Sequence, residues 1–195
     1  VGRSKVLILA AYTKLRAICN HPALAGSSRT DGGIKSSDSG KLDCLQELME
    51  EIIEGEHRAL LFCQSTKMLD IIEEFFGKWK FEERKIRTMR LDGSTPPNRR
   101  QGMVDELNGD NSIDCFLIST KAGGTGLNLT GADTVIFYDH DWNPANDNQA
   151  QDRAYRIGQT KPVTVYKLVS KGTIEEKIIE RQAIKQSLAD EIIGA

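Results

Sequence analysis

The chain has 195 residues, with 26 Lys and Arg against 28 Asp and Glu, so its formal net charge is −2. Hydrophobic residues make up 39% of the sequence and charged residues 28%, which is ordinary for a globular protein and argues against disorder along the whole chain. No run approaches the roughly 20 apolar residues that a membrane-spanning helix needs. The first residues lack the pattern of a secretory signal, and we expect the chain to be a piece of a longer protein.

The cysteines, Cys19, Cys44, Cys63 and Cys115, are far apart in the sequence, and the histidines are equally scattered. No spacing typical of a zinc site or a redox pair is present, so we expect no metal site. Cys63 and Cys115 lie inside apolar runs and are expected to be small core residues. This use of cysteine favours a reducing compartment inside the cell.

Apolar residues recur at steps of three and four over residues 5–18, which predicts a helix that ends before Pro22. Residues 25–39 are rich in glycine and serine, which favours a loop or flexible linker. Helical and strand patterns then alternate. We expect helices at 41–55, 66–76, 96–107 (with Thr95 as N-cap) and 147–156. We expect strands at 58–63, 86–93, 114–120, 133–139 and 163–170. A long last helix should begin at a capping box formed by Thr173 and Glu176.

Strands that alternate with helices require crossover connections, so the pattern predicts an α/β fold with a mostly parallel sheet covered by helices on both faces. Ligands of such sheets bind at the carboxyl ends of the strands. We therefore expect functional residues in the loops at 64–66, 92–95, 120–129 and 139–146.

The loop at 119–131 follows a predicted strand and contains Gly123, Gly124 and Gly126. Glycines leave the backbone open to a phosphate group, and Thr120 and Lys121 could donate hydrogen bonds to it. A plain glycine-rich turn has the same composition, so both interpretations stay open. The loop lacks the third glycine of a dinucleotide-binding motif.

Lys41 follows Gly40, as the lysine of a phosphate-binding P-loop follows a glycine. The match fails because Leu42 stands where serine or threonine is needed and a linker precedes the motif instead of a strand. We expect no triphosphate cradle in this chain.

Gln149, Arg153 and Arg156 recur at steps of four and three, so a helix would place them on one face. Two guanidinium groups on one face suit a polyanion, because each can bind phosphate oxygens through two hydrogen bonds. A solvated or salt-bridged helix face is the alternative. Two other features are equally open: Trp142 could stack on a base or pack against its own domain, and the basic stretch at 78–100 could bind nucleic acid or be a solvated surface.

Several motifs occur in a fixed order along the chain. They are "ICNHPAL" (18–24), "LLFCQSTKMLDIIEEFF" (60–76), "RLDGST" followed by Arg100 (90–100), "STKAGGTGLNLTGADTVIFYDHDWNP" (119–144), "QAQDRAYRIGQ" (149–159) and "VYKLVSKGTIEEKI" (165–178). As an ordered set they resemble the second, C-terminal RecA-like lobe of the Swi/Snf-type helicase-like ATPases, which are DNA translocases of chromatin remodelling and repair. The resemblance implies a helical lead-in at 1–24, a flexible linker at 25–39, a three-layer RecA-like lobe at 40–170 and a brace helix at 171–195.

The resemblance also implies a nucleotide site shared with a second lobe. Arg153 and Arg156 would be arginine fingers that reach across the cleft between the lobes to the phosphates of ATP, and Gln149 would help to position them. Gly126 and Asn128 would lie on the nucleotide side of the cleft. The Mg²⁺ that accompanies ATP would be held mainly by the first lobe, which this chain lacks, so the chain alone is expected not to hydrolyse ATP.

The partners implied by the resemblance are double-stranded DNA and the N-terminal RecA-like lobe of the same protein, with nucleosomes as a further candidate and no membrane. Arg100 would support DNA contact or the structure of the lobe. The residues implied to contact DNA, with Trp142 placed against one strand, are Gln64, Ser65, Arg100, Thr120, Lys121 and Trp142. The location would be nuclear in a eukaryote and cytoplasmic otherwise.

Two alternatives remain at this point. The chain could belong to a catalytically inactive helicase-like scaffold that only binds DNA or protein, or it could belong to an RNA helicase. The motifs "WNP" and "RAYRIGQ" favour the translocase over the RNA helicase.

Overall fold

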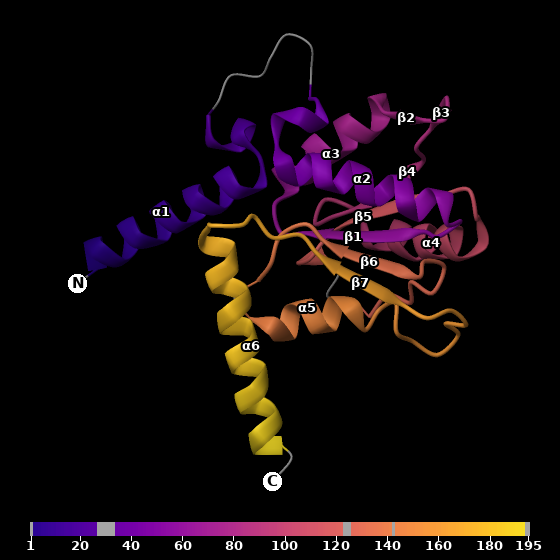
Figure 1. The fold of residues 1–195 in the computed structure, drawn as a ribbon. Helices are drawn as coiled ribbons and strands as arrows, with labels where there is room; N and C mark the ends of the chain where they lie inside the picture. The colour runs from indigo at the N-terminus through magenta and orange to yellow at the C-terminus, as the bar shows by residue number, and fades with distance from the viewer. Residues whose placement is uncertain (1, 27–33, 123–125, 142, 194–195) are drawn as a thin grey trace.

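The computed structural model describes residues 2–26, 34–122, 126–141 and 143–193. Within these ranges five strands form one sheet, in the order β4-β5-β1-β6-β7, and every neighbouring pair is parallel (Figure 1). The predicted parallel α/β sheet is therefore confirmed. The strands are β1 (Ala59–Cys63), β4 (Thr88–Leu91), β5 (Cys115–Ser119), β6 (Thr134–Phe137) and β7 (Thr164–Lys167).

Helices cover both faces of this sheet. On one face lie α2 (Gly40–Glu54) and α3 (Thr66–Lys78), and on the other lie α4 (Pro97–Gly109) and α5 (Pro144–Gln151). Each strand contributes side chains to both core layers, because successive side chains point to opposite faces of the sheet. In β1, Leu61 packs toward α2 and α3, whereas Leu60 packs toward α4.

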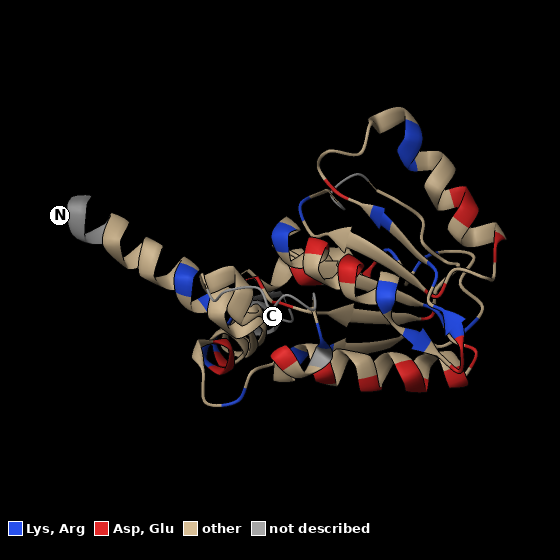
Figure 2. Ribbon diagram, turned by 90° about the horizontal axis from the view of Figure 1, so that it is seen from above, with Lys and Arg blue, Asp and Glu red and all other residues tan. Residues whose placement is uncertain are grey.

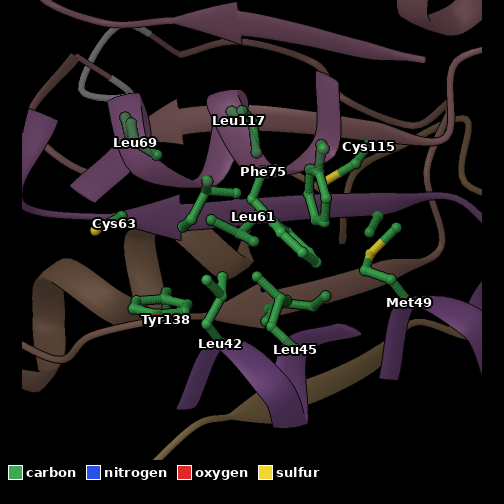
Figure 3. Packing of buried hydrophobic residues seen from close by; sticks show 14 of the residues in the cluster. Leu42, Leu45, Met49, Leu61, Cys63, Leu69, Phe75, Cys115, Leu117 and Tyr138 are labelled. Carbon is green, nitrogen blue, oxygen red and sulfur yellow. The ribbon is translucent and has the colours of Figure 1, made fainter. Parts of the chain in front are cut away.

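Figure 3 shows the first of these layers, in which side chains of α2 and α3 interlock over β1 and β5. Cys63 and Cys115 lie in this layer as fully buried residues, which confirms their predicted core role. The labelled residues are Leu42, Leu45, Met49, Leu61, Cys63, Leu69, Phe75, Cys115, Leu117 and Tyr138.

Two long helices extend from one end of the sheet. The first, α1 (Gly2–Asn20), projects away from the rest of the molecule (Figures 1 and 2), and the charged residues in its sequence are all basic. The last, α6 (Ile174–Ile193), buries Ile178 and Gln182 in its first half but exposes Ile184 and Leu188 farther along. None of the described helices is both long and apolar enough to span a membrane.

Short elements complete the fold. The 3₁₀ helices η1 (Pro22–Ala25) and η2 (Ser36–Asp38) lie between α1 and α2. A hairpin that sequence patterning missed joins β2 (Lys80–Phe81) to β3 (Arg84–Lys85) through Glu82 and Glu83, which both have positive φ. Residues 27–33 of the predicted linker lie outside the described residues, and the proposed domain boundaries stay a prediction.

The predicted helix at 147–156 is wrong at both ends. Helix α5 begins earlier, at Pro144, because the side chain of Asn143 accepts a hydrogen bond from the Ala145 amide as an N-cap. It ends at Gln151, and residues 152–158 form turns and bends. Beyond the end of the helix, the chain instead contacts a loop that is distant in sequence: the Leu129 amide donates a hydrogen bond to the Arg153 carbonyl at 3.1 Å.

Smaller corrections concern helix starts. Pro96, not Thr95, caps α4, and the Thr95 hydroxyl instead accepts a hydrogen bond from the Asp92 amide at 3.0 Å. At α6, Thr173 Oγ1 accepts from the Glu175 amide and the Glu176 carboxylate accepts from the Gly172 amide. Both residues predicted to cap α6 do so, although each bonds one position away from the standard capping box.

Lys41, which does not match the lysine of a P-loop, joins two helices through an ion pair. Its Nζ lies 2.5 and 2.6 Å from the carboxylate oxygens of Glu175 at the start of α6 and 3.2 Å from the Tyr138 carbonyl oxygen. Lys41 is 7% exposed and Glu175 is 2% exposed. This buried ion pair fixes α6 to α2 and to the end of β6.

Replacing Lys41 with methionine should lower the free energy of unfolding by about 3–5 kcal/mol, because the Glu175 carboxylate is left charged and buried. The double variant Lys41→Met/Glu175→Leu should regain most of this loss. As a control, Lys78→Met removes an exposed pair with Glu74 and should cost less than about 1 kcal/mol. Urea unfolding measures all three, and equal losses for Lys41→Met and Lys78→Met would contradict the prediction.

Candidate functional site

The connection from β5 to β6 crosses one face of the sheet. It begins at the carboxyl edge, where the Thr120 amide donates to the Cys63 carbonyl at 3.0 Å, and it ends at the amino edge, where the Asp133 amide reaches the Arg58 carbonyl. Leu127, Leu129 and Ala132 pack into the core layer of α4 and α5. Residues 126–132 therefore lie along the flank of the sheet; we call them the flank loop.

Both predicted finger arginines contact this flank loop. The Arg153 carbonyl accepts from the Leu129 amide, and Arg156 Nη1 donates to the Gly126 carbonyl oxygen at 2.8 Å. Gly126 has φ +54, a conformation that glycine adopts readily. The structure thus brings Gly126, Arg153 and Arg156 together, although the helix face that was expected to align the arginines is absent.

The two guanidinium groups differ in exposure. Arg156 is exposed, whereas Arg153 is only 3% exposed, and its Nε and Nη1 atoms are buried without a hydrogen-bond partner among the described residues. Burial lowers the pKa of Arg153, and the positive charge of Arg156 lowers it further. Two nearby positive charges with no carboxylate paired to either among the described residues favour an anionic partner.

The other residues predicted for the nucleotide site are less tightly connected to the arginines. Gln149 is exposed on α5, and no hydrogen bond between described residues joins it to Arg153 or Arg156. Asn128 is exposed in the flank loop, and its carbonyl oxygen accepts from Asn108 Nδ2 at 2.9 Å. Gly123 and Gly124 lie outside the described residues.

A second cluster lies at the carboxyl edge of the sheet, as predicted for a parallel fold. Gln64, Ser65 and Lys121 line a groove of about 200 Å³, together with residues of α1 that sequence patterning did not single out. Arg16 of α1 donates to Gln64 Oε1 at 2.9 Å, and the Gln64 amide donates to Asp139 at 2.7 Å. The lining residues from α1 are Thr13, Arg16, Ala17 and Asn20, and Asp139 joins them from the segment that follows β6.

The remaining residues predicted to contact DNA lie apart from this groove or cannot be placed. Thr120 precedes Lys121 and continues the β1–β5 ladder. Arg100 Nε donates to the Thr95 carbonyl oxygen at 3.1 Å and so supports the loop after β4. Trp142 lies outside the described residues.

Acidic neighbours neutralise part of the basic stretch at 78–100, which favours the interpretation as a solvated surface. Arg84 forms two hydrogen bonds to Asp114, at 2.8 and 2.9 Å. Arg90 pairs with Asp70, Glu73 and Asp92. This stretch therefore offers less free positive charge than its composition suggests.

A cavity of about 690 Å³ lies at the opposite, amino edge of the sheet. Several of its charged residues are paired with one another: Lys161 and His57 both bind Asp133, at 3.2 and 2.8 Å, and Arg84 binds Asp114. It shares no residue with the groove beside α1. No group of three or more His, Cys, Asp or Glu side chains among the described residues could hold a metal ion.

The family model described as "Helicase conserved C-terminal domain" matches residues 40–158. The chain belongs to this helicase family. The ordered motifs, together with the relatives below, identify it as the C-terminal RecA-like lobe of the Swi/Snf-type members of this family.

Relatives and a solved structure agree with this membership. The chain is 51% identical to the chromatin-remodeling ATPase INO80 of Cryptococcus neoformans over 80% of its own length and 9% of that protein. It is 44% identical to the DNA excision repair protein CSB of rice, Oryza sativa, over 92% of its length and 15% of that protein. The crystal structure of the C-terminal part of the Fun30 ATPase domain matches with a TM-score of 0.71 and 37% identity, over 88% of this chain and 54% of that one. The chain therefore spans only a small part of these two curated relatives.

The burial of an unpaired guanidinium predicts a stabilising substitution. Arg153→Met should raise the free energy of unfolding by about 1–3 kcal/mol, because the methionine fills similar space without a charge to desolvate. The matched variant Arg156→Met, at an exposed position, should change it by no more than about 0.5 kcal/mol. Urea unfolding compares the two, and a destabilised Arg153→Met would show that the guanidinium has a partner inside this chain.

Proposed function

We propose that this chain is the second lobe of an ATP-dependent double-stranded DNA translocase that acts in chromatin remodelling or DNA repair. The observation that carries the proposal is the buried guanidinium of Arg153, whose Nε and Nη1 atoms have no hydrogen-bond partner among the described residues, in a turn that contacts the flank loop together with Arg156. Two relatives whose names include a chromatin-remodeling ATPase and a DNA excision repair protein support the choice of process.

In this proposal the arginines stabilise negative charge on the phosphoryl group that is transferred from ATP to water. Arg156 is exposed and can meet a phosphate directly, with Gly126 and Asn128 beside it. Arg153 is covered in the isolated lobe, so its contact with a phosphate requires the turn and the flank loop to shift together when the lobes close. Gln149 would help to orient the arginines from the end of α5.

The groove beside α1 is the proposed contact with the DNA backbone. Lys121 is exposed there and can bind a phosphate, and Gln64 and Ser65 stand beside it. Contacts of this kind hold a duplex without reading its sequence. Thr120, Arg100 and Trp142 are the further residues proposed to contact DNA.

The cycle then follows from two lobes that each hold the duplex. Closing of the cleft around ATP brings the arginines to the phosphates, and hydrolysis lets the lobes separate, which moves the protein along DNA. Mg²⁺ would be held mainly by the first lobe, and the protein would act in the nucleus of a eukaryote, with nucleosomes as a further candidate substrate.

The proposal predicts that Arg156→Ala lowers DNA-stimulated ATP hydrolysis at least 100-fold in the protein that carries both lobes, because the transferring phosphoryl group loses a fixed positive charge. Its exposed position leaves the free energy of unfolding within about 0.5 kcal/mol of the wild type. Phosphate release in the presence of duplex DNA measures the loss, and near-normal turnover would contradict the assignment.

The same assay separates the alternatives. A wild-type protein that hydrolyses ATP no faster than a buffer control would favour the scaffold, whereas stimulation by RNA in place of duplex DNA would favour an RNA helicase.

A further inference from the structure

The turn that carries both proposed finger arginines has little regular structure of its own. It lies between the end of α5 at Gln151 and the start of β7 at Thr164. Its local backbone bonds are single turn contacts, such as those from the Ala154 amide to Gln151 and from the Gln159 amide to Arg156, both at 3.0 Å. A segment without a helical ladder needs other contacts to hold two side chains at fixed positions.

The carboxamide of Gln159 supplies such contacts. Its Nε2 donates to the Ala132 carbonyl oxygen at 2.9 Å and to the Thr130 carbonyl oxygen at 3.3 Å, both at the end of the flank loop. The same nitrogen lies 3.5 Å from the Ala154 carbonyl oxygen, within the turn itself. Its Oε1 accepts from the Lys161 amide at 3.0 Å.

Chemistry fixes the orientation of this carboxamide. Carbonyl oxygens can only accept hydrogen bonds and a backbone amide can only donate, so the nitrogen must face Ala132 and the oxygen must face Lys161. One side chain thereby ties the turn, the flank loop and the approach to β7 together. Leucine has a similar size but could make none of these bonds.

The flank loop that Gln159 binds also contacts both arginines. The same loop receives the Arg156 guanidinium at Gly126 and bonds the Arg153 backbone through Leu129. Loss of the Gln159 contacts would therefore let the turn move relative to the loop. Positioning errors of about 1 Å at a reacting group can lower a rate 100-fold.

We propose that Gln159 is a positioning residue that holds the turn of Arg153 and Arg156 against the flank loop, so that both guanidinium groups reach the nucleotide phosphates together. This inference rests on the proposed function of the arginines. Gln159 itself contacts backbone groups of this chain and is assigned no contact with ATP.

Steady-state ATP hydrolysis by the two-lobe protein, with saturating duplex DNA, tests the proposal. Gln159→Leu should lower kcat about tenfold or more while the KM for ATP changes less than twofold, because the arginines act mainly in the transition state. Gln159→Glu has nearly the same shape but repels the carbonyl oxygens, and it should lower kcat at least as much. Gln101→Leu removes a comparable exposed hydrogen bond to Asp105 on α4 and should leave both constants unchanged.

DNA affinity and thermal unfolding separate positioning from a general structural role. The Gln159 variants should bind duplex DNA within twofold of the wild type and should remain folded at the assay temperature. Normal kcat in both Gln159 variants, with Arg156→Ala inactive, would overturn this inference and leave the proposed function standing. Parallel loss of kcat and DNA affinity would also overturn it. Normal turnover in Arg156→Ala would instead overturn the proposed function.

Discussion

A positive charge held inside the protein, with no counter-ion in the part of the chain that the structure describes, is the constraint on which the interpretation of this lobe depends. Burial of the Arg153 guanidinium costs free energy, and no described residue hydrogen-bonds its Nε or Nη1 atom. A neutral side chain would serve the fold better at that position. The arrangement is understandable when the partner is an anion supplied from outside the lobe. The positive charge of the exposed Arg156 nearby also disfavours the charged form of Arg153, and an anion would offset both charges.

One connection links the two proposed sites of the lobe. The chain leaves β5 through Thr120 and Lys121 at the groove beside α1, and it reaches the arginines at Gly126 and Leu129. Its first residue is fixed to β1 through Cys63, and its last part is fixed by Gln159. A duplex bound in the groove and a nucleotide bound at the arginines would therefore act on the same short connection, which gives a physical route for DNA-stimulated hydrolysis.

Local sequence patterns predicted the fold more completely than they predicted the site. An apolar run such as Ala59–Cys63 predicts a buried strand because both of its faces are covered, and the structure confirms it. The steps between Gln149, Arg153 and Arg156 predicted a helix, and this failed because the helix ends where Leu129, 24 residues earlier in the sequence, bonds Arg153. Arg16 and Gln159 were missed because their partners lie far from them in the sequence, where periodicity carries no signal.

The central claim concerns where the Arg153 guanidinium lies when both lobes hold their ligands. The most direct measurement is an experimental structure of the two-lobe protein with duplex DNA and a transition-state analogue of ATP. The account predicts that the guanidinium nitrogens of Arg153 and Arg156 lie at hydrogen-bond distance, about 3 Å, from oxygens of the phosphate analogue. An Arg153 that stays buried in the closed complex, with no phosphate oxygen in reach, would contradict it.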